Sequence, residues 1–536
     1  MSNLLGGMLP GNGLNKLFRR KTLDHLVGET TVPEHQLRRT LGPLQLTMLG
    51  VGAIVGAGIF STPGTAAAGG ADHIGAGPAL VVSFLLVAVA CSFAALCYSE
   101  FAAMVPVSGS AYTYAYATLG ELAAWLIGWD LILEYAISNA AVAVSWSGYF
   151  QTLLGTIHVH VGWLGLDFQP HLPEWLGTDV ITAVRSAHQV AAAHGDLTKL
   201  SPDALQAARV CAEAPHLFGL PIVFNLPAFA IVVLVTWIVL IGMKETARFN
   251  TALVIGKLAI VVFFLVLGAC YVHPSNWVPF APHGWRGISG AAAIIFFAYI
   301  GFDAVSTAAE ETRNPQRDMP IGIIASLLIC TVLYVAVAVV LTGIAPWNTL
   351  GNAEPLAKVF TDLGMNWTAG VIAVGALIAT TSAMVPYQAG QPRIFFAMGR
   401  DGLLPPWAAK VHPRYRTPHV TTLITGVVVA LCASVFNIDE LVDLTNVGTL
   451  FAFILVALGI IILRYKDPDR PRPFRTPLVP WVPLGAIACC GYLMFQLPLM
   501  TWFRFFGWMA VGLLLYFFYG FGNSRLNGNG RDPGGH

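Results

Sequence analysis

Two charged residues stand inside long apolar stretches of this chain, where a charge needs a specific reason to be present. Lys257 lies in Gly256-Lys-Leu-Ala-Ile-Val-Val-Phe-Phe, and Asp303 lies in Phe302-Asp-Ala-Val-Ser. Removing an ionised group from water is costly, so such residues usually serve a function. Two simpler explanations stay open: a lysine can extend its stem toward a membrane surface, and an aspartate can face water at a helix end.

Glycine is unusually dense in the first apolar segment. Gly50, Gly52, Gly56 and Gly58 fall within nine residues of the stretch from Leu49 to Phe60. Each glycine costs a helix interior about 1 kcal/mol relative to alanine, and close packing of two helices needs only two small residues four apart. We therefore predict that the backbone leaves helical geometry here, and again at Gly301 beside Asp303.

Two interrupted helices predict a particular kind of ligand. Within a membrane, unpaired peptide groups are tolerated only where they line a cavity. The N–H groups at the start of a half-helix suit a carboxylate, and the carbonyl groups freed at an opposing break suit an ammonium group. A free α-amino acid carries both charges. The breaks fall in the first and sixth apolar segments, and breaks at matching positions of two halves are typical of a transporter site.

The composition requires that these residues sit in a membrane protein. Hydrophobic residues make up 56% of the chain and charged residues 11%, against about a quarter charged in soluble domains. The net charge is +1, and no basic run suits nucleic acid.

The apolar segments are long enough to span a membrane, since a helix needs roughly 20 apolar residues to span a bilayer. They predict an all-α integral membrane protein with twelve transmembrane helices at about 44–61, 78–104, 121–154, 224–241, 251–272, 288–309, 320–344, 368–396, 420–436, 441–463, 481–496 and 500–521.

The connecting segments predict the orientation. Lys and Arg are concentrated in alternate connections, which places both termini in the cytoplasm of a cell inner (plasma) membrane protein. The N-terminal tail is 1–43, with a surface helix near 14–26, and the C-terminal tail is 522–536. One outer loop is long, about 155–220, and Pro202–Glu213 reads as an amphipathic helix. Its histidines are too irregularly spaced to favour a metal site, namely His158, His160, His171, His188 and His194.

Four long motifs occur in an order that resembles a known family. They are the glycine segment near residue 55, Ser99-Glu-Phe-Ala-Ala-Met-Val-Pro-Val-Ser-Gly-Ser-Ala-Tyr-Thr-Tyr114, Phe302-Asp-Ala-Val-Ser-Thr through Asn314-Pro315, and Gly390-Gln-Pro-Arg-Ile-Phe-Phe-Ala-Met-Gly-Arg-Asp-Gly-Leu403-Leu404. Together they resemble the amino acid–polyamine–organocation superfamily, in particular its cationic amino acid transporter branch and the bacterial proton-coupled relatives of that branch. The resemblance runs from about residue 41 to 480.

This resemblance implies a LeuT-like fold and the atoms that meet the substrate. Spans 1–5 (44–272) and 6–10 (288–463) would form inverted repeats with spans 1 and 6 broken, and two extra helices (478–521) would follow. The substrate carboxylate is expected on the N–H groups of Ala57 and Gly58, with Ile54 beside them. The amine is expected on carbonyl groups of span 6, and the candidates are Phe297, Ala298 and Ile300.

An aromatic lid is also implied. Phe302 is the first candidate for the ring that closes over the substrate and Phe297 the second, with packing in the helix bundle as the alternative for either ring. Relatives often carry threonine or serine at the position of Ala57, so alanine here favours a small apolar substrate side chain.

The resemblance further implies a role for Lys257. Some bacterial relatives carry a lysine at this place in span 5, where sodium-coupled members bind sodium. Protonated, Lys257 would hydrogen-bond carbonyl groups at the break of span 1 and link it to span 8, where Thr380, Thr381 and Ser382 are the candidates. Because burial disfavours the charged form of a lysine, proton loss to the cytoplasm could release the two bundles for movement.

The resulting hypothesis is a proton-coupled importer of small neutral amino acids such as alanine. Cationic substrates stay open as an alternative. Asp130 and Glu134 lie one turn apart, and their simpler interpretation is a polar stripe on the inner side. An amino acid or polyamine exchanger without proton coupling is the first alternative, and a membrane amino acid sensor is the second. An enzyme is disfavoured because we find no intramembrane HExxH or GxSxG motif, and no cofactor or metal is expected.

Overall fold

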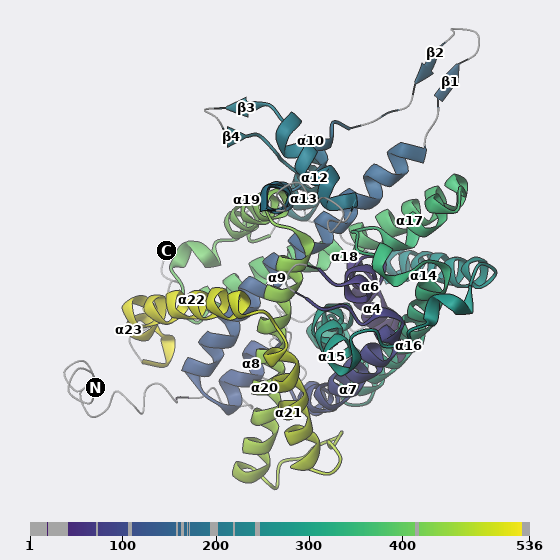
Figure 1. Ribbon diagram of the computed structural model, residues 1–536. Coiled ribbons are helices and arrows are strands. Elements are labelled where there is room, and N and C mark those ends of the chain that lie inside the picture. Colours follow the sequence, from purple (N-terminus) through teal and green to yellow (C-terminus); the bar gives the residue numbers. More distant parts are fainter. Residues whose placement is uncertain are drawn as a thin grey trace.

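The computed structural model describes residue 19 and residues 41–527, apart from short gaps at 71–72, 106–109, 157–158, 162–165, 169, 171, 193–201, 218–219, 242–246 and 413–416. Within these ranges the protein is a bundle of helices (Figure 1). The surface helix predicted near 14–26 lies outside the described residues, as do three of the five histidines of the long loop, His158, His171 and His194.

The longest helices form the body of the bundle. They are α7 (Leu80–Met104), α9 (Glu121–Thr156), α14 (Ala247–Ala269), α16 (Pro315–Ile344), α18 (Asn366–Arg400), α20 (Ile438–Lys466) and α22 (Leu499–Leu515). The span that begins with α22 continues through η10 (Tyr516–Gly520) and α23 (Phe521–Asn523). Three further apolar helices of 15 to 17 residues accompany these spans, α13 (Leu226–Ile241), α19 (His419–Val435) and α21 (Trp481–Phe495).

The first and sixth predicted segments are interrupted helices. The first consists of α4 (Pro43–Ile54), α5 (Ala57–Phe60) and α6 (Thr62–Ala68). The sixth consists of α15 (Gly284–Ile295), η6 (Phe296–Tyr299) and η7 (Asp303–Glu311). Each of the twelve predicted segments coincides with one of these elements, and eight of the described helices, or nine with the bent first pair, are long and apolar enough to cross a membrane. That all twelve cross the bilayer stays a prediction.

The connections contain more structure than the sequence indicated. The amphipathic helix predicted at Pro202–Glu213 is present as α12, but α10 (Glu174–Gly177) and α11 (Val180–Ala192) precede it. The all-α prediction is confirmed for the bundle, and the long connection also contains two small antiparallel hairpins, β1 (Val159–Val161) with β2 (Leu166–Phe168) and β3 (His216–Leu217) with β4 (Leu220–Pro221). Short helices α8 (Ser110–Thr118) and α17 (Pro355–Asp362) also join longer ones.

Burial separates interior helices from peripheral ones. The apolar stretch of α9 is entirely buried, whereas only about 28% of the corresponding stretches that contain α14 and α22 is buried. This agrees with the sequences, because α9 carries Asp130, Glu134 and Asn139 in its middle, and polar side chains cannot face lipid cheaply. Figure 1 shows α9 running through the centre of the bundle.

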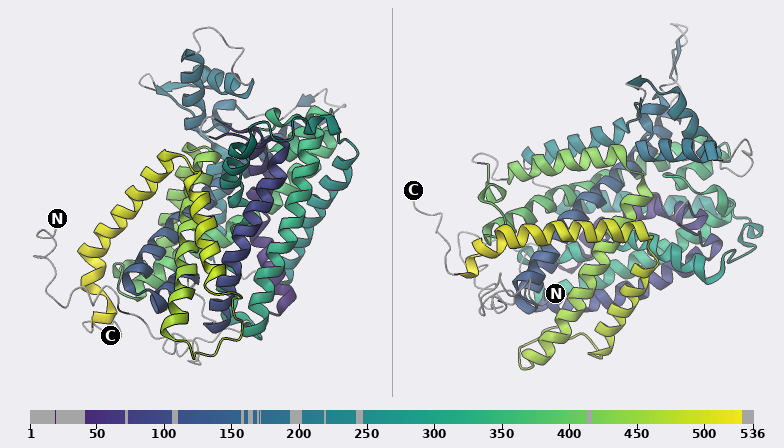
Figure 2. Two further views of the ribbon diagram at one scale, coloured as in Figure 1. Left: turned by 60° about the horizontal axis from the view of Figure 1, so that its bottom comes forward. Right: turned by 60° about the vertical axis from the view of Figure 1, so that its left-hand side comes forward.

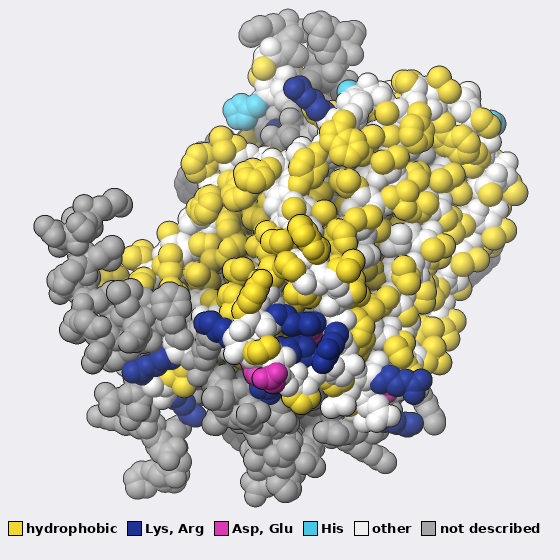
Figure 3. Space-filling view, turned by 90° about the horizontal axis from the view of Figure 1, so that it is seen from below, with side chains coloured by type: hydrophobic (Ala, Val, Ile, Leu, Met, Phe, Trp, Pro, Cys, Tyr) yellow, Lys and Arg dark blue, Asp and Glu magenta, His cyan; other side chains and the backbone are white. Residues whose placement is uncertain are grey.

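The two ends of the bundle differ. Figure 2 shows the segment with α10, α11 and α12 projecting from one end, and the connection between α20 and α21 at the opposite end. In Figure 3, Lys and Arg side chains gather along the margin of a broad hydrophobic surface. A wide apolar surface bounded by cations is typical of a protein embedded in a bilayer.

Candidate functional site

The break in the first segment lies at Val55 and Gly56. The two half-helices on either side are bent by 52°, and Gly56 has φ −148° and ψ −142°, outside helical geometry. The N–H groups of Gly56, Ala57 and Gly58 have no hydrogen-bond acceptor among the described residues. The prediction of a broken helix is therefore confirmed, and its second half begins with unpaired donors at Ala57 and Gly58.

The break in the sixth segment lies between Tyr299 and Asp303. Gly301 has φ +122°, a conformation that side-chain-bearing residues rarely adopt. Its N–H donates to Asp303 Oδ1 at 3.2 Å, so this carboxylate caps the second half of the segment. The prediction of a second break at Gly301 is confirmed, and the structure assigns the Asp303 carboxylate a local partner that the sequence did not reveal.

The carbonyl groups at this second break are not equivalent. The Phe297 carbonyl accepts from the N–H of Ile300 at 3.3 Å. The Ala298 and Ile300 carbonyl groups receive no hydrogen bond from the residues that the structure describes. The two available acceptors are thus Ala298 and Ile300, while Phe297 would have to share its carbonyl oxygen.

The two breaks touch through their glycines. A Cβ atom added to Gly58 would lie 2.3 Å from the Cα of Ala298, and one added to Gly301 would lie 2.9 Å from the carbonyl carbon of Ala53. Each break therefore has a glycine where the other backbone approaches too closely for a side chain. This contact brings the unpaired donors of the first break next to the unpaired acceptors of the second.

Lys257 reaches the break from α14. Its side chain is buried, with 2% of the residue exposed, so the alternative of a lysine extending to the surface is wrong. Nζ donates to the carbonyl oxygen of Gly52 at 2.8 Å and to that of Val55 at 3.2 Å. These carbonyl groups end α4, where no further helical turn supplies an N–H donor.

Two further contacts hold the end of α4. The hydroxyl group of Tyr334, on α16, donates to the Ile54 carbonyl oxygen at 3.0 Å, and Gly56 faces α18, where an added Cβ would lie 3.1 Å from that of Ala383. Sequence reasoning missed Tyr334. The available signal was a tyrosine in an otherwise apolar span, because a buried hydroxyl group generally needs a hydrogen-bond partner.

The three candidate hydroxyl groups on α18 are used mainly within their own helix. Thr380 donates to Ala376, Thr381 to Leu377 and Ser382 to Ala379. Thr381 additionally accepts from Trp146 Nε1 at 2.9 Å. Their link to Lys257 stays a prediction.

The two candidate lid aromatics differ in their surroundings. The ring of Phe302 is fully buried and packs between Tyr98 and Phe453, at centroid distances of 6.0 and 5.1 Å. Phe297 is also buried, with 5% of the residue exposed, but its ring makes no ring–ring contact within the described part of the chain. Phe302 thus occupies the bundle-packing environment named as the alternative, which makes Phe297 the better candidate for a movable ring.

Three carboxylates are buried in the bundle interior, those of Asp130, Glu134 and Asp303. Asp130 and Glu134 on α9 are buried, with 0% and 2% of each residue exposed, and Glu134 lies within electrostatic range of Asp130 and Asp303. Both carboxylate oxygens of Asp130 and the Oε2 atom of Glu134 lack a hydrogen-bond partner among the described residues. The two residues predicted to form a polar stripe on the inner side are therefore buried in this conformation, and their place on the inner side stays a prediction.

Glu100, by contrast, has a structural environment. Its carboxylate pairs with Arg464 at 2.8 Å and with Arg472 at 3.2 Å, and it accepts from the N–H of Thr476. These contacts join α7 to the end of α20 and the segment that follows. In the described ranges no group of three or more His, Cys, Asp or Glu side chains is arranged to hold a metal ion.

Comparison with known proteins adds a family. Residues 41–516 match the model of a family described as amino acid permease. The chain is 44% identical to the branched-chain amino acid permease BcaP of Bacillus subtilis over 512 residues, which cover 95% of this chain and 99% of that protein. It is 43% identical to the methylthioribose transporter of the same organism, covering 96% and 100%. The vacuolar cationic amino acid transporter 4 of Arabidopsis thaliana is 35% identical, covering 85% and 68%.

Proposed function

Because the chain belongs to the amino acid permease family, we propose that it is a secondary active transporter that imports amino acids together with protons. It is a membrane-spanning permease and not an enzyme, in keeping with its relatives. The proposal includes a LeuT-like arrangement of two inverted repeats, twelve spans with both termini in the cytoplasm, and a place in the inner (plasma) membrane.

One observation carries the assignment of the substrate. The N–H groups of Ala57 and Gly58 are unpaired donors, and the contact between Gly58 and Ala298 places them beside the unpaired carbonyl groups of Ala298 and Ile300. In this proposal the substrate carboxylate binds the donors, where the helix dipole also favours an anion. The ammonium group binds the acceptors, and Ile54 lies against the bound molecule.

Alternating access follows from the enclosure of the breaks. Ile54, Ala57, Phe297 and Ala298 are all buried, so a substrate held between them has no direct path to water in this conformation. Access from either side requires the broken segments to move against the rest of the bundle. Phe297 is the ring that we propose opens and closes over the substrate, and Phe302 the ring that anchors the broken segment in the bundle.

Lys257 supplies the proposed coupling to protons. When charged, its ammonium group satisfies the carbonyl groups of Gly52 and Val55 and holds the end of α4 in place. When neutral, the amine keeps only two N–H donors and loses the charge that strengthens both hydrogen bonds. Release of the proton toward the cytoplasm would then free α4 from α14, and Thr380, Thr381 and Ser382 would complete the contact with α18.

The substrate that we favour is a small neutral L-amino acid such as alanine. Ala57 presents a methyl group at the break, where a hydroxyl group would otherwise add polarity. One relative is named for branched-chain amino acids, which extends the candidates to larger apolar side chains. Another is named for methylthioribose, which carries neither a carboxylate nor an ammonium group, so that compound is an essential comparison in any test.

A cationic substrate is the second candidate, and the buried acids favour it. Glu134 and Asp303 are both buried, and a substrate side chain bearing a positive charge would stabilise their ionised forms. If this were the substrate class, Glu134→Gln would abolish competition by arginine and lysine while sparing alanine.

Competition for binding tests the substrate assignment. Purified protein would be incubated with labelled alanine and an excess of alanine, leucine, arginine, ethylamine, propionate or methylthioribose. We expect only compounds with both an α-carboxylate and an α-ammonium group to compete. Equal competition by ethylamine, propionate or methylthioribose would contradict the two-ended site. The two alternative functions, exchange without proton coupling and sensing without transport, use the same binding site. They predict the same competition and differ from the proposal only in whether and how the bound substrate is then transported.

A further inference from the structure

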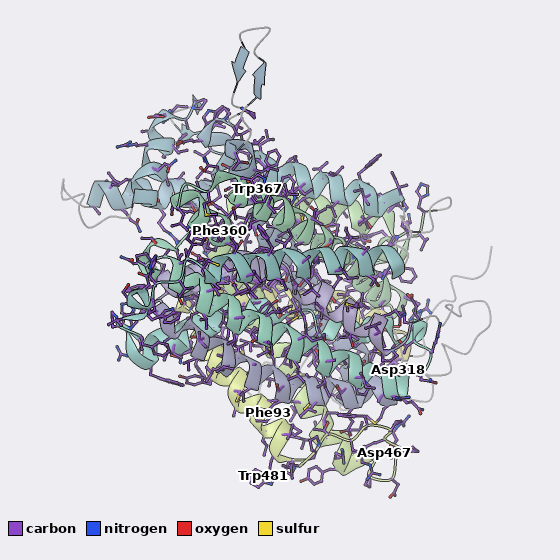
Figure 4. All side chains as sticks on the ribbon, turned by 90° about the vertical axis from the view of Figure 1, so that its right-hand side faces the viewer. Phe93, Asp318, Phe360, Trp367, Asp467 and Trp481 are labelled. Carbon is purple, nitrogen blue, oxygen red and sulfur yellow. The ribbon has the colours of Figure 1, made fainter. Side chains whose placement is uncertain are left out.

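A groove of about 640 Å³ lies on the outside of the bundle, away from the breaks. The first half of α16 forms one wall, and Pro473 and Phe474, in the connection between α20 and α21, form the other. Figure 4 shows that Asp318 of α16 and Asp467 at the end of α20 lie toward the same end of the molecule. The groove therefore opens near the polar end of the helices and continues along α16.

The α16 wall is a single stripe of the helix. The groove is lined by Arg317, Pro320, Ile321, Ile324 and Leu328. Apart from the adjacent pair Pro320 and Ile321, these residues recur every three or four positions, which places them on one helical face. From Arg317 to Leu328 the stripe extends about 16 Å at 1.5 Å per residue. Ile321 and Leu328 are exposed on a helix apolar enough to span a bilayer, so this surface meets lipid chains.

A free cation stands at the polar end of the stripe. The Arg317 side chain is exposed, and its guanidinium group has no ion pair or hydrogen bond within the described ranges. Arg475, next to Phe474, is also exposed and unpaired among those residues. Arg464 and Arg472 of the same region are instead held by Glu100. Of these four arginines, two are held by Glu100 and two have a charge that is available to a ligand.

We propose that this groove is a specific binding site for an anionic phospholipid. The phosphate group would bind Arg317, with Arg475 adding positive charge, and one acyl chain would lie along Ile321, Ile324 and Leu328 beneath Phe474. A cation followed by an apolar channel matches the order of headgroup and chain in such a lipid, and the cytoplasmic leaflet is rich in anionic lipids. The bound lipid would join α16 to the connection between α20 and α21.

Thermal unfolding of the detergent-purified full chain tests the site. Phosphatidylglycerol, phosphatidylcholine and inorganic phosphate would be added separately, and native mass spectrometry would count retained lipids. We expect phosphatidylglycerol alone to raise the midpoint by several degrees and to remain bound. This test uses the wild-type protein and needs no variant. Equal effects of phosphatidylcholine, or of phosphate without lipid, would overturn the proposal.

Three variants locate the effect. Arg317→Gln should reduce phosphatidylglycerol retention about tenfold, and Ile324→Trp should do the same by filling the channel. Arg313→Gln is the matched control, because Arg313 is exposed at the same end of α16 but does not line the groove. Unchanged retention by Arg317→Gln, or an equal loss in Arg313→Gln, would show that the lipid binds elsewhere. None of these measurements depends on amino acid transport.

Discussion

The ammonium nitrogen of Lys257 lies 2.8 Å from the carbonyl oxygen of Gly52. One residue is in the middle of α14 and the other is in the last turn of α4, and the same nitrogen also donates to the carbonyl oxygen of Val55 just beyond that turn, so one side chain connects a continuous helix to the edge of a broken one. Removing the buried ammonium group would leave two carbonyl groups unpaired, and each unpaired buried group costs about 1–3 kcal/mol.

The first prediction concerns this lysine. Lys257→Met keeps most of the side-chain volume and removes the charge, so we expect uptake driven by a proton gradient to fall at least about tenfold, since 1.4 kcal/mol corresponds to a factor of ten. Substrate binding should persist, because the donors at Ala57 and Gly58 are untouched. Lys410→Met, at an exposed position, is the control. Uptake by Lys257→Met that still responds fully to pH would refute the coupling role.

A second prediction concerns Tyr334. Tyr334→Phe deletes the hydroxyl group that holds the Ile54 carbonyl but keeps the ring contacts with Phe84 and Tyr299. Loss of one hydrogen bond of about 1 kcal/mol should weaken alanine binding about fivefold.

Tyr299→Phe is the matched control for Tyr334→Phe. Its hydroxyl group belongs to the same aromatic cluster but donates to the Phe84 carbonyl on α7. Equal effects of the two changes in a binding titration would mean that the cluster, and not the end of α4, determines affinity.

The third prediction concerns the contact between the breaks. Gly58→Ala would place a methyl group 2.3 Å from the Cα of Ala298, and overpacking of this kind costs about 1–3 kcal/mol. We expect a lower unfolding midpoint together with loss of alanine binding. Gly507→Ala in α22, where an added Cβ meets nothing within 4 Å, should leave both unchanged. A Gly58→Ala protein with normal stability and binding would contradict the close approach.

A fourth prediction separates structural from functional acids. Glu100 is nearly inaccessible and holds both Arg464 and Arg472. Glu100→Gln leaves a buried guanidinium group without its countercharge, which typically costs about 3–5 kcal/mol. The unfolding midpoint should drop strongly, whereas Glu311→Gln at an exposed position should have little effect. A normal midpoint for Glu100→Gln would mean that the ion pairs contribute little.

Local sequence chemistry was sufficient to predict the two breaks. Four glycines near residue 55, and Gly301 beside Asp303, reported backbone geometry directly, because glycine is costly in a helix and favoured at positive φ. Lys257 was recognisable for a similar reason, since a charge in an apolar span needs a buried partner. These signals are contained within a few residues and do not depend on how the helices pack.

Features that depend on packing could not be predicted in this way. Whether Phe302 or Phe297 has room to move is decided by Tyr98 and Phe453, which come from other helices. The burial of Asp130 follows from α20, where Gly448 leaves space for its carboxylate: a Cβ there would lie 2.6 Å from Oδ1. Sequence periodicity identifies a helical face but not the helix that covers it.

Accumulation of alanine in proteoliposomes tests the central claim most directly. The vesicles would contain no amino acid, and an inward proton gradient would be imposed with and without a protonophore. Proton-coupled import predicts that internal alanine rises above the external concentration and that the protonophore abolishes the rise. Uptake that needs internal amino acid and ignores the gradient would contradict the account and indicate exchange.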